Sequence, residues 1–187
     1  GYTVSMHDHR GHGRTAEKNE APFGYFAARN GFMRVVEDVE NVMYALIGDA
    51  PFILFGHSMG SFIARRYVQA FPNRVQKLIL CGTGAESLLH VAGKVAARVL
   101  AKKDGDTTPS PLLNELSFKA FNKPFQPNRT DFDWLAQNEE AVDAYKGDPY
   151  CGFVATTRFY ADLSDGILLV SSMREVRKTP NIQILLI

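Results

Sequence analysis

The chain has 187 residues and a formal net charge of +1 at pH 7, with 45% hydrophobic and 22% charged residues. This length fits one domain that carries an insertion, and the composition supports a packed core rather than disorder. The nearly neutral charge excludes the basic surface typical of nucleic-acid-binding proteins, so we expect no nucleic-acid partner. The longest predominantly apolar segments, such as residues 182–187, are far too short to cross a bilayer, so we expect no membrane span.

Cysteine usage and the two chain ends add little about cellular context. Cys81 and Cys151 are too few for a disulfide scaffold and lack the CxxC spacing of a metal or redox pair, so we expect a reducing compartment, the cytoplasm. The chain starts at Gly1 and ends in an apolar run, residues 182–187, that resembles a buried strand. Both ends resemble cuts through a fold, so the lack of a signal peptide carries no information.

Strands and helices alternate over residues 1–84. The residue pattern predicts, in chain order, a strand over 1–6, a Gly- and His-rich loop over 7–15, a helix over 32–47, a strand over 52–55, a helix over 59–71 and a strand over 77–81. Pro51 and Pro72 are expected to end the two helices. The later strands are continuous apolar runs, which are typical of strands covered on both faces. This alternation predicts an α/β fold with a parallel sheet.

Residues 85–178 differ from the rest because no strand pattern is evident there. The pattern predicts an amphipathic helix over 88–99, a second helix capped by Ser110 with Pro111 in its first position, a third helix through Trp134 and a fourth over 153–163. A helical insertion of this length is too long for a crossover, so we expect a cap or lid. The predicted parts are a core over residues 1–84, a cap over 85–178 and a return strand of the core over 179–187.

Gly56, His57, Ser58, Met59 and Gly60 form a G-x-S-x-G motif between a predicted strand and a predicted helix. A nucleophilic serine on such an elbow adopts a strained backbone, and we expect Gly56 and Gly60 to supply space for the neighbouring strand and helix. The helix that starts at Met59 directs its positive end toward a developing oxyanion, and the Met59 N–H is one donor to it. His57 is expected to point away from Ser58 and to serve in packing or hydrogen bonding. The alternative is a glycine-bounded turn whose serine only caps the helix.

Three features together resemble the α/β-hydrolase superfamily: the segment Asp8-His9-Arg10-Gly11-His12-Gly13 after a strand, the motif at 56–60 and the helical insertion. The closest resemblance is to its branch of monoacylglycerol lipases and lysophospholipases. The resemblance implies Ser58 as the nucleophile that forms the acyl-enzyme, the Met59 N–H as half of the oxyanion hole and residues 85–178 as a cap over the acyl site. It places Asp8 and Arg10 in a loop that organises structure near the site, and it implies no metal or cofactor.

The same resemblance places other parts of such a site outside the chain. In this superfamily the second oxyanion donor precedes the strand at 1–6, and the acid and histidine of the triad follow the strand at 182–187. The family's strand order also leaves the strand at 1–6 without its neighbour. We expect His90, the single histidine after Ser58, to be a surface or cap residue, and Asp148 to lie in a turn. The chain is therefore expected to be an internal piece of a longer enzyme and nearly inactive alone, because loss of a triad histidine costs about 10⁶ in kcat.

The predicted function is a serine hydrolase that cleaves carboxylic esters of lipid type, monoacylglycerol or lysophospholipid, through an acyl-enzyme. The same scaffold also serves peptidases and small-ester esterases, and a non-catalytic acyl-binding module and a peripheral membrane contact through the cap stay open. A metallohydrolase site at His7, Asp8, His9 and His12 is opposed by the alternation of side chains along a strand. Aromatic residues of the insertion fit either an acyl-chain pocket or packing between cap helices: Phe118, Phe121, Phe125, Phe132, Trp134, Phe153 and Phe159.

Overall fold

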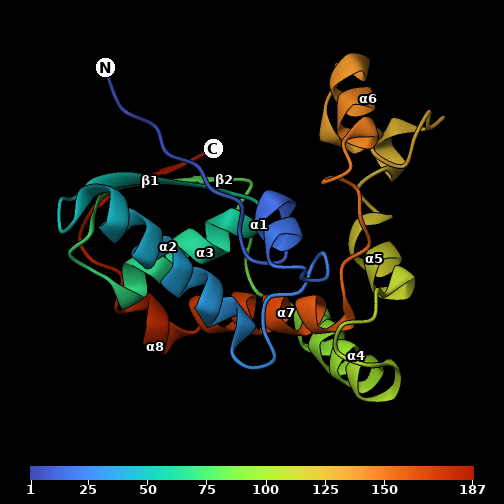
Figure 1. Cartoon of the computed structure of the whole chain (residues 1–187), viewed down its shortest axis with the longest axis horizontal. Helices are drawn as coiled ribbons and strands as arrows, with labels where there is room; N and C mark the ends of the chain where they lie inside the picture. The colour runs from blue at the N-terminus through green and yellow to red at the C-terminus, as the bar shows by residue number, and fades with distance from the viewer. The chain divides into compact units, whose positions relative to one another are not determined.

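The computed structural model describes all 187 residues, which divide into two compact units. Unit 1 comprises Gly1–Tyr25 and Val99–Phe159, and unit 2 comprises Phe26–Arg98 and Tyr160–Ile187. Two long helices, α4 (Leu88–Asp104) and α7 (Thr157–Ser171), each contribute to both units (Figure 1). The division into units thus crosses the predicted cap, and the three-part division at residues 84 and 178 stays a prediction.

Unit 2 contains a parallel sheet of three strands in the order β1, β2, β3, of which Figure 1 labels β1 and β2. The strands are β1 (Phe52–His57), β2 (Val75–Cys81) and β3 (Gln183–Leu186). In the register of the sheet, His57 lies opposite Cys81, and Lys77 lies opposite Gln183. The predicted α/β class and parallel sheet are therefore confirmed.

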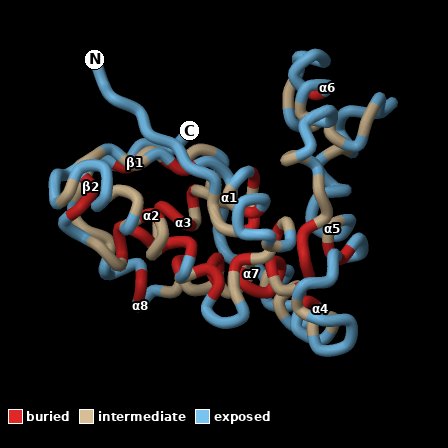
Figure 2. The backbone as a smooth tube through the Cα atoms, in the orientation of Figure 1, coloured by how far each residue is buried: buried red, intermediate tan, exposed pale blue.

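Helices cover one face of this sheet. Helix α3 (Met59–Ala70) packs on β1 and β2, and α2 (Gly31–Ile47) packs on α3. Helix α7 and the short helix α8 (Met173–Val176) contact the side of these helices that faces away from the sheet: the Gln69 amide nitrogen donates to Val170 O at 3.0 Å, and Phe32 lies tightly against Gly166. Figure 2 shows buried residues along α2, α3 and α7 where these helices pack against one another. The core of unit 2 includes Val35, Val36, Val39, Ile63, Ala64, Tyr67, Val68, Leu78, Leu80 and Val170.

The predicted strand over residues 1–6 is wrong, because this segment has no strand geometry in the structure. Its apolar side chains are exposed, with Tyr2 at 86% and Met6 at 91%. An extended segment becomes a strand only when a neighbour accepts and donates its backbone hydrogen bonds, and the sheet contains β1, β2 and β3 alone.

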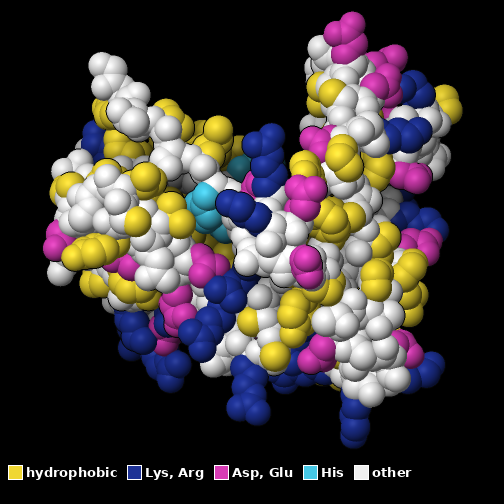
Figure 3. Space-filling model, in the orientation of Figure 1, with side chains coloured by type: hydrophobic (Ala, Val, Ile, Leu, Met, Phe, Trp, Pro, Cys, Tyr) yellow, Lys and Arg dark blue, Asp and Glu magenta, His cyan; other side chains and the backbone are white.

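The prediction that the strands are covered on both faces is also wrong. Ile53 and Phe55 of β1 are 37% and 57% exposed, whereas Gly56 is buried, and every residue of β3 is exposed. Successive side chains of a strand point to opposite faces, so one face of β1 meets α3 while the other remains open. Hydrophobic side chains are correspondingly visible on the surface around the strands in Figure 3.

The two helices predicted around the elbow motif are confirmed with small shifts at their ends. The helix predicted over 32–47 is α2, and Gly48, with φ of 58°, ends it before Pro51 is reached. The helix predicted over 59–71 is α3, which ends at Ala70. The Ser110 hydroxyl caps α5 (Pro111–Phe118) by accepting from the Leu113 N–H at 3.4 Å, as predicted.

The rest of the insertion is helical but differs from the prediction in detail. Two single-turn 3₁₀ helices, Lys123–Phe125 and Asp133–Leu135, replace the predicted helix through Trp134. The helix predicted over 153–163 begins later and continues further, as α7. Three α-helices are absent from the prediction: α1 (Gly13–Lys18), α6 (Glu139–Gly147) and α8 (Met173–Val176). None of the helices combines the length and hydropathy that a membrane span requires.

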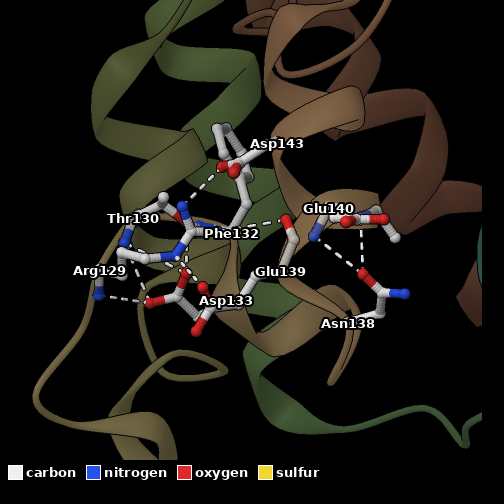
Figure 4. A network of polar contacts seen from close by, with 9 residues as sticks. Arg129, Thr130, Phe132, Asp133, Asn138, Glu139, Glu140 and Asp143 are labelled. Atoms are coloured by element: carbon white, nitrogen blue, oxygen red, sulfur yellow. Dashed lines mark hydrogen bonds and ion pairs between the residues drawn. The ribbon is translucent and has the colours of Figure 1, made fainter.

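Polar contacts organise the turn that precedes α6 (Figure 4). The Asp133 carboxylate accepts from the Thr130 hydroxyl and from the Arg129 N–H, both at 2.6 Å, and the Arg129 guanidinium pairs with Asp143 at 2.6 Å. Asn138 caps α6 by accepting from the N–H groups of the first turn. These short-range bonds close a tight turn where the sequence suggested a longer helix.

Candidate active site

Ser58 lies at the junction between the end of β1 and the start of α3, with φ of 49° and ψ of −118°. A non-glycine residue rarely adopts this conformation, which costs about 1–3 kcal/mol and persists only where the surroundings impose it. The residue is exposed, and its hydroxyl makes no capping bond to the helix. The alternative that Ser58 is only a helix cap is therefore wrong, and the predicted strained elbow is the observed geometry.

Backbone bonds and one close approach impose this conformation on Ser58. The Ser58 N–H donates to Cys81 O of the neighbouring strand at 2.9 Å, and the Ser58 carbonyl accepts from the hydroxyl of buried Ser61 at 2.6 Å. A Cβ at Gly56 would lie 2.7 Å from the carbonyl carbon of Gly60 and 2.9 Å from the Ala64 Cβ. The elbow therefore requires glycine at position 56.

Gly60 differs from the expectation that it supplies space. A Cβ at Gly60 would meet no atom within 4 Å. A side chain at position 56 would collide with the backbone of Gly60, whereas a side chain at position 60 would not collide with any atom. Only the first glycine of the motif is therefore needed to avoid crowding.

Met59 opens helix α3, and its N–H is available to an oxyanion. The first N–H groups of a helix have no partner within the helix, and the Met59 N–H donates no hydrogen bond in unit 2. The positive end of the helix dipole is located at the same point. A negative charge that develops next to the exposed Ser58 hydroxyl would therefore be stabilised by this terminus, although the role of Met59 itself stays a prediction.

The histidines of unit 2 do not supply a base to Ser58. His57 is exposed, and a Cβ at Gly82 would lie 3.7 Å from its Nε2. His90, near the start of α4, accepts from the Ser87 N–H at 3.0 Å through Nδ1. Within unit 2 the Ser58 hydroxyl makes no side-chain hydrogen bond, and the role of Ser58 as the nucleophile stays a prediction.

Asp148 lies in the predicted turn. It follows the end of α6, and its carboxylate accepts from the Tyr150 N–H at 2.8 Å. This bond within the turn accounts for the polar residue at this position.

Asp8 and Arg10 organise the start of α1 in unit 1. The Asp8 carboxylate accepts from the Arg14 N–H at 2.9 Å, and the Asp8 carbonyl accepts from the Thr15 hydroxyl at 2.9 Å. The Arg10 carbonyl lies 3.1 Å from His12 Nδ1, and burial lowers the pKa of His12 against the opposing effects of this bond and of Asp8. The Asp8 side chain thus contacts the start of α1, whereas the bond described for Arg10 is made by its backbone carbonyl, and the expected role of both residues near the site stays a prediction.

The residues of the alternative metal site make contacts with other side chains and backbone groups of unit 1. Asp8 is engaged by the N–H of Arg14, and the rings of His7 and His9 stack edge to face at 4.9 Å between centroids. The structure contains no group of three or more His, Cys, Asp or Glu side chains arranged to hold a metal ion. The geometry therefore gives the metallohydrolase alternative no support.

Comparison with protein families places these features in context. A family model described as serine aminopeptidase, S33, matches residues 1–186. The chain belongs to this family of hydrolases. The S33-family assignment covers both the elbow at Ser58 and the insertion.

Individual relatives of this S33-family chain are α/β-hydrolases. A monoacylglycerol lipase of Mycolicibacterium smegmatis is 28% identical over 152 residues, which are 80% of this chain and 46% of the lipase. A lipase solved in its open form is 29% identical with a TM-score of 0.79 and aligns with 96% of this chain and 59% of its own. A thermostable carboxyl esterase from Bacillus coagulans, in complex with glycerol, shares the fold at 24% identity and a TM-score of 0.82, with 95% of this chain and 58% of the esterase aligned. The chain thus spans about half the length of these relatives.

Proposed function

We propose that this chain carries the nucleophile of a serine hydrolase that cleaves carboxylic esters through an acyl-enzyme. The observation that carries the proposal is the backbone of Ser58, which is held at positive φ with its side chain exposed at the start of α3. Strain of this kind persists where function requires it, and this position presents a hydroxyl at the positive end of a helix.

In the proposed reaction the Ser58 oxygen attacks the ester carbonyl and the Met59 N–H donates to the carbonyl oxygen as it becomes negative. The serine proton passes to a base and then to the leaving alcohol, and water later releases the acid from the acyl-enzyme. Loss of one oxyanion donor costs roughly 10²–10³ in kcat, so a fixed backbone donor contributes substantially to such a step.

The proposed substrates are lipid esters of the monoacylglycerol or lysophospholipid type. One relative is named a monoacylglycerol lipase, and this chain exposes apolar side chains suited to a lipid. On α4 these are Leu88 at 86%, Leu89 at 81%, Val91 at 46% and Val95 at 57% exposed. Exposed apolar residues on one helix also support the proposal of a peripheral membrane contact through the insertion.

Part of the aromatic set in the insertion forms ring contacts. Trp134 stacks on Phe118 with ring centroids 6.2 Å apart and contacts Phe121 at 5.0 Å, while Phe132 contacts Tyr145 at 5.2 Å. Phe118 and Phe121 nevertheless stay 36% and 50% exposed, and Leu112 and Leu116 are exposed at 56% and 70%. Figure 3 shows hydrophobic side chains on the surface of the part that holds α5. The exposed apolar surface of the insertion, which includes part of this aromatic set, supports the lipid substrate.

An aminopeptidase is the second candidate, because the family description names that activity. The same elbow geometry attacks esters and amides. Turnover of a p-nitrophenyl butyrate ester against that of a leucine p-nitroanilide separates the two activities, and we expect the ester to be the better substrate.

We propose further that the chain alone lacks the base of the triad and therefore turns over slowly. The Ser58 hydroxyl has no hydrogen-bond partner in unit 2, and His90 is engaged by Ser87.

The proposed compartment is a reducing one, the cytoplasm. The two free thiols, Cys81 and Cys151, fit this proposal.

The experiment that tests the function is covalent labelling of Ser58 by a fluorophosphonate with and without added imidazole. Imidazole can replace a missing general base, so we expect it to accelerate the formation of an adduct that mass spectrometry locates on Ser58. The matched control is Ser58→Ala, which removes only the hydroxyl oxygen and should abolish the adduct. Labelling that is absent, or equal in the two proteins, would refute the proposal.

A further inference from the structure

Arg65 lies on helix α3, less than two turns after the elbow, and three contacts hold its guanidinium in one orientation. Nη1 donates to the Gly84 carbonyl at 2.8 Å, and Nη2 donates to the Ser171 hydroxyl at 3.2 Å. The guanidinium also lies over the Phe62 ring, 5.6 Å from its centroid. The guanidinium is planar and rigid, so little entropy is lost when it forms these bonds. Arg65 therefore links α3 rigidly to Gly84 and to Ser171.

The segment that Arg65 binds, residues 82–84, adjoins the nucleophile. Ser58 donates its N–H to Cys81 O at 2.9 Å, directly before this segment. A Cβ at Gly82 would lie 3.7 Å from His57 Nε2 and 4.0 Å from Ser58 N. Residues 82–84 therefore continue directly from the residue that binds the Ser58 backbone, and a shift of this segment would disturb that hydrogen bond.

Few other contacts hold this segment in place. The Gly82 N–H donates to Ile187 O at 2.9 Å, and the Thr83 hydroxyl is buried without a hydrogen-bond partner. Gly82 has φ of 57°, a conformation open to few residues other than glycine. Arg65 is thus the side chain that secures the far end of the segment, at Gly84.

Partial burial of Arg65 strengthens this link. Removal from water lowers the pKa of the Arg65 guanidinium, and the charge of nearby Glu86 opposes the change. An arginine remains charged under such a perturbation, and a charged donor makes a shorter and stronger hydrogen bond to a carbonyl than a neutral one.

The neighbouring Arg66 has a different role on the same helix. Its guanidinium pairs at 2.5 Å with Glu175, a carboxylate that is 2% exposed, and donates to Met33 Sδ at 3.1 Å. These contacts join α3 to α8 and α2, away from residues 82–84. Arg66 therefore provides a matched control for a substitution on this helix.

We propose that Arg65 is a positioning residue for acylation of Ser58: it fixes residues 82–84, and through Cys81 O the backbone of Ser58, in the arrangement from which the hydroxyl attacks. This inference rests on the proposed function and extends it to a residue outside the elbow motif. Arg65 contacts no reacting atom, so its effect should appear in the rate of acylation rather than in the affinity for a small probe.

The test is the labelling of Ser58 by a fluorophosphonate in imidazole buffer, with the maximal rate and the half-saturating concentration measured separately. Arg65→Met keeps the aliphatic stem and removes both hydrogen bonds, so we expect the maximal rate to fall at least about tenfold with little change in half-saturation, since small misplacements of reacting groups cost up to about 10²-fold. Arg65→Lys retains one charged donor and should restore part of the rate. Hydrogen exchange at the amides of Ser58 and Gly82 should become faster in Arg65→Met.

The control variant Arg66→Met should unfold at lower temperature but label at the wild-type rate under conditions where it is folded. An unchanged maximal rate in Arg65→Met, or an equal loss in Arg66→Met, would overturn the positioning role while leaving the proposed function intact. If the wild-type chain does not label at Ser58, the proposed function fails and the role of Arg65 in acylation fails with it. If Arg65→Met does not fold, the rate of Arg65→Lys and its amide exchange decide the question.

Discussion

Alanine at the two glycines of the elbow motif should have opposite effects on stability. In Gly56→Ala the new Cβ would lie 2.7 Å from the Gly60 carbonyl carbon and 2.9 Å from the Ala64 Cβ, and it would lie closer still to the Gly60 oxygen. Two of these atoms belong to backbone that cannot rotate away, so β1 and α3 must move apart. Overpacking of this kind costs about 1–3 kcal/mol. Each kcal/mol shifts Tm by about 2–4 °C in a chain of this size, so we expect a decrease of roughly 2–12 °C.

Gly60→Ala is the matched control because it makes the same chemical change four residues away. A Cβ there meets no atom within 4 Å, and residue 60 lies in the first turn of α3. Alanine is favoured over glycine in a helix by about 0.5–1 kcal/mol, so this variant should unfold at the wild-type temperature or a few degrees above it.

Thermal unfolding followed by far-UV circular dichroism measures both variants, and labelling of Ser58 reports the elbow itself. We expect Gly56→Ala to lose labelling together with stability. A Tm of Gly56→Ala equal to that of the wild type, or equal decreases in both variants, would refute the steric account of the elbow.

Two further predictions concern Ser58 and a buried carboxylate. Ser58→Gly should be more stable than Ser58→Ala by about 1 kcal/mol in urea unfolding, because glycine adopts φ of 49° without strain; equal stabilities would contradict the strain argument. Hydrogen bonds from Lys178 and then Arg66 lower the pKa of Glu175 from 4.5 to about 2 despite burial, so its contribution to stability is complete above pH 4.5 and is lost as the pH falls toward 2. Glu175→Gln should therefore show a flatter loss of stability over this pH range, and parallel profiles would exclude Glu175 as the cause.

The elbow and most of the adjacent elements could be predicted from the sequence because their signals are local. Gly56 and Ser58 stand between an apolar run and a helical pattern, and the strand, the turn and the helix appear there in the structure. Ser110 followed by Pro111 predicts the start of α5 for the same reason, since a cap and the first turn involve only neighbouring residues.

Only the tertiary structure decided which surfaces are buried and which distant segments meet. Residues 1–6 have a strand-like sequence but remain exposed, because a strand depends on a neighbour that no local pattern supplies. The helical pattern alone gives Arg65 no special role. In the structure it nevertheless joins Gly84, 19 residues away, to Ser171, 106 residues away. Local sequence specifies the conformation of a few neighbouring residues, whereas contacts across such separations depend on how whole elements pack, and that packing is a property of the folded chain.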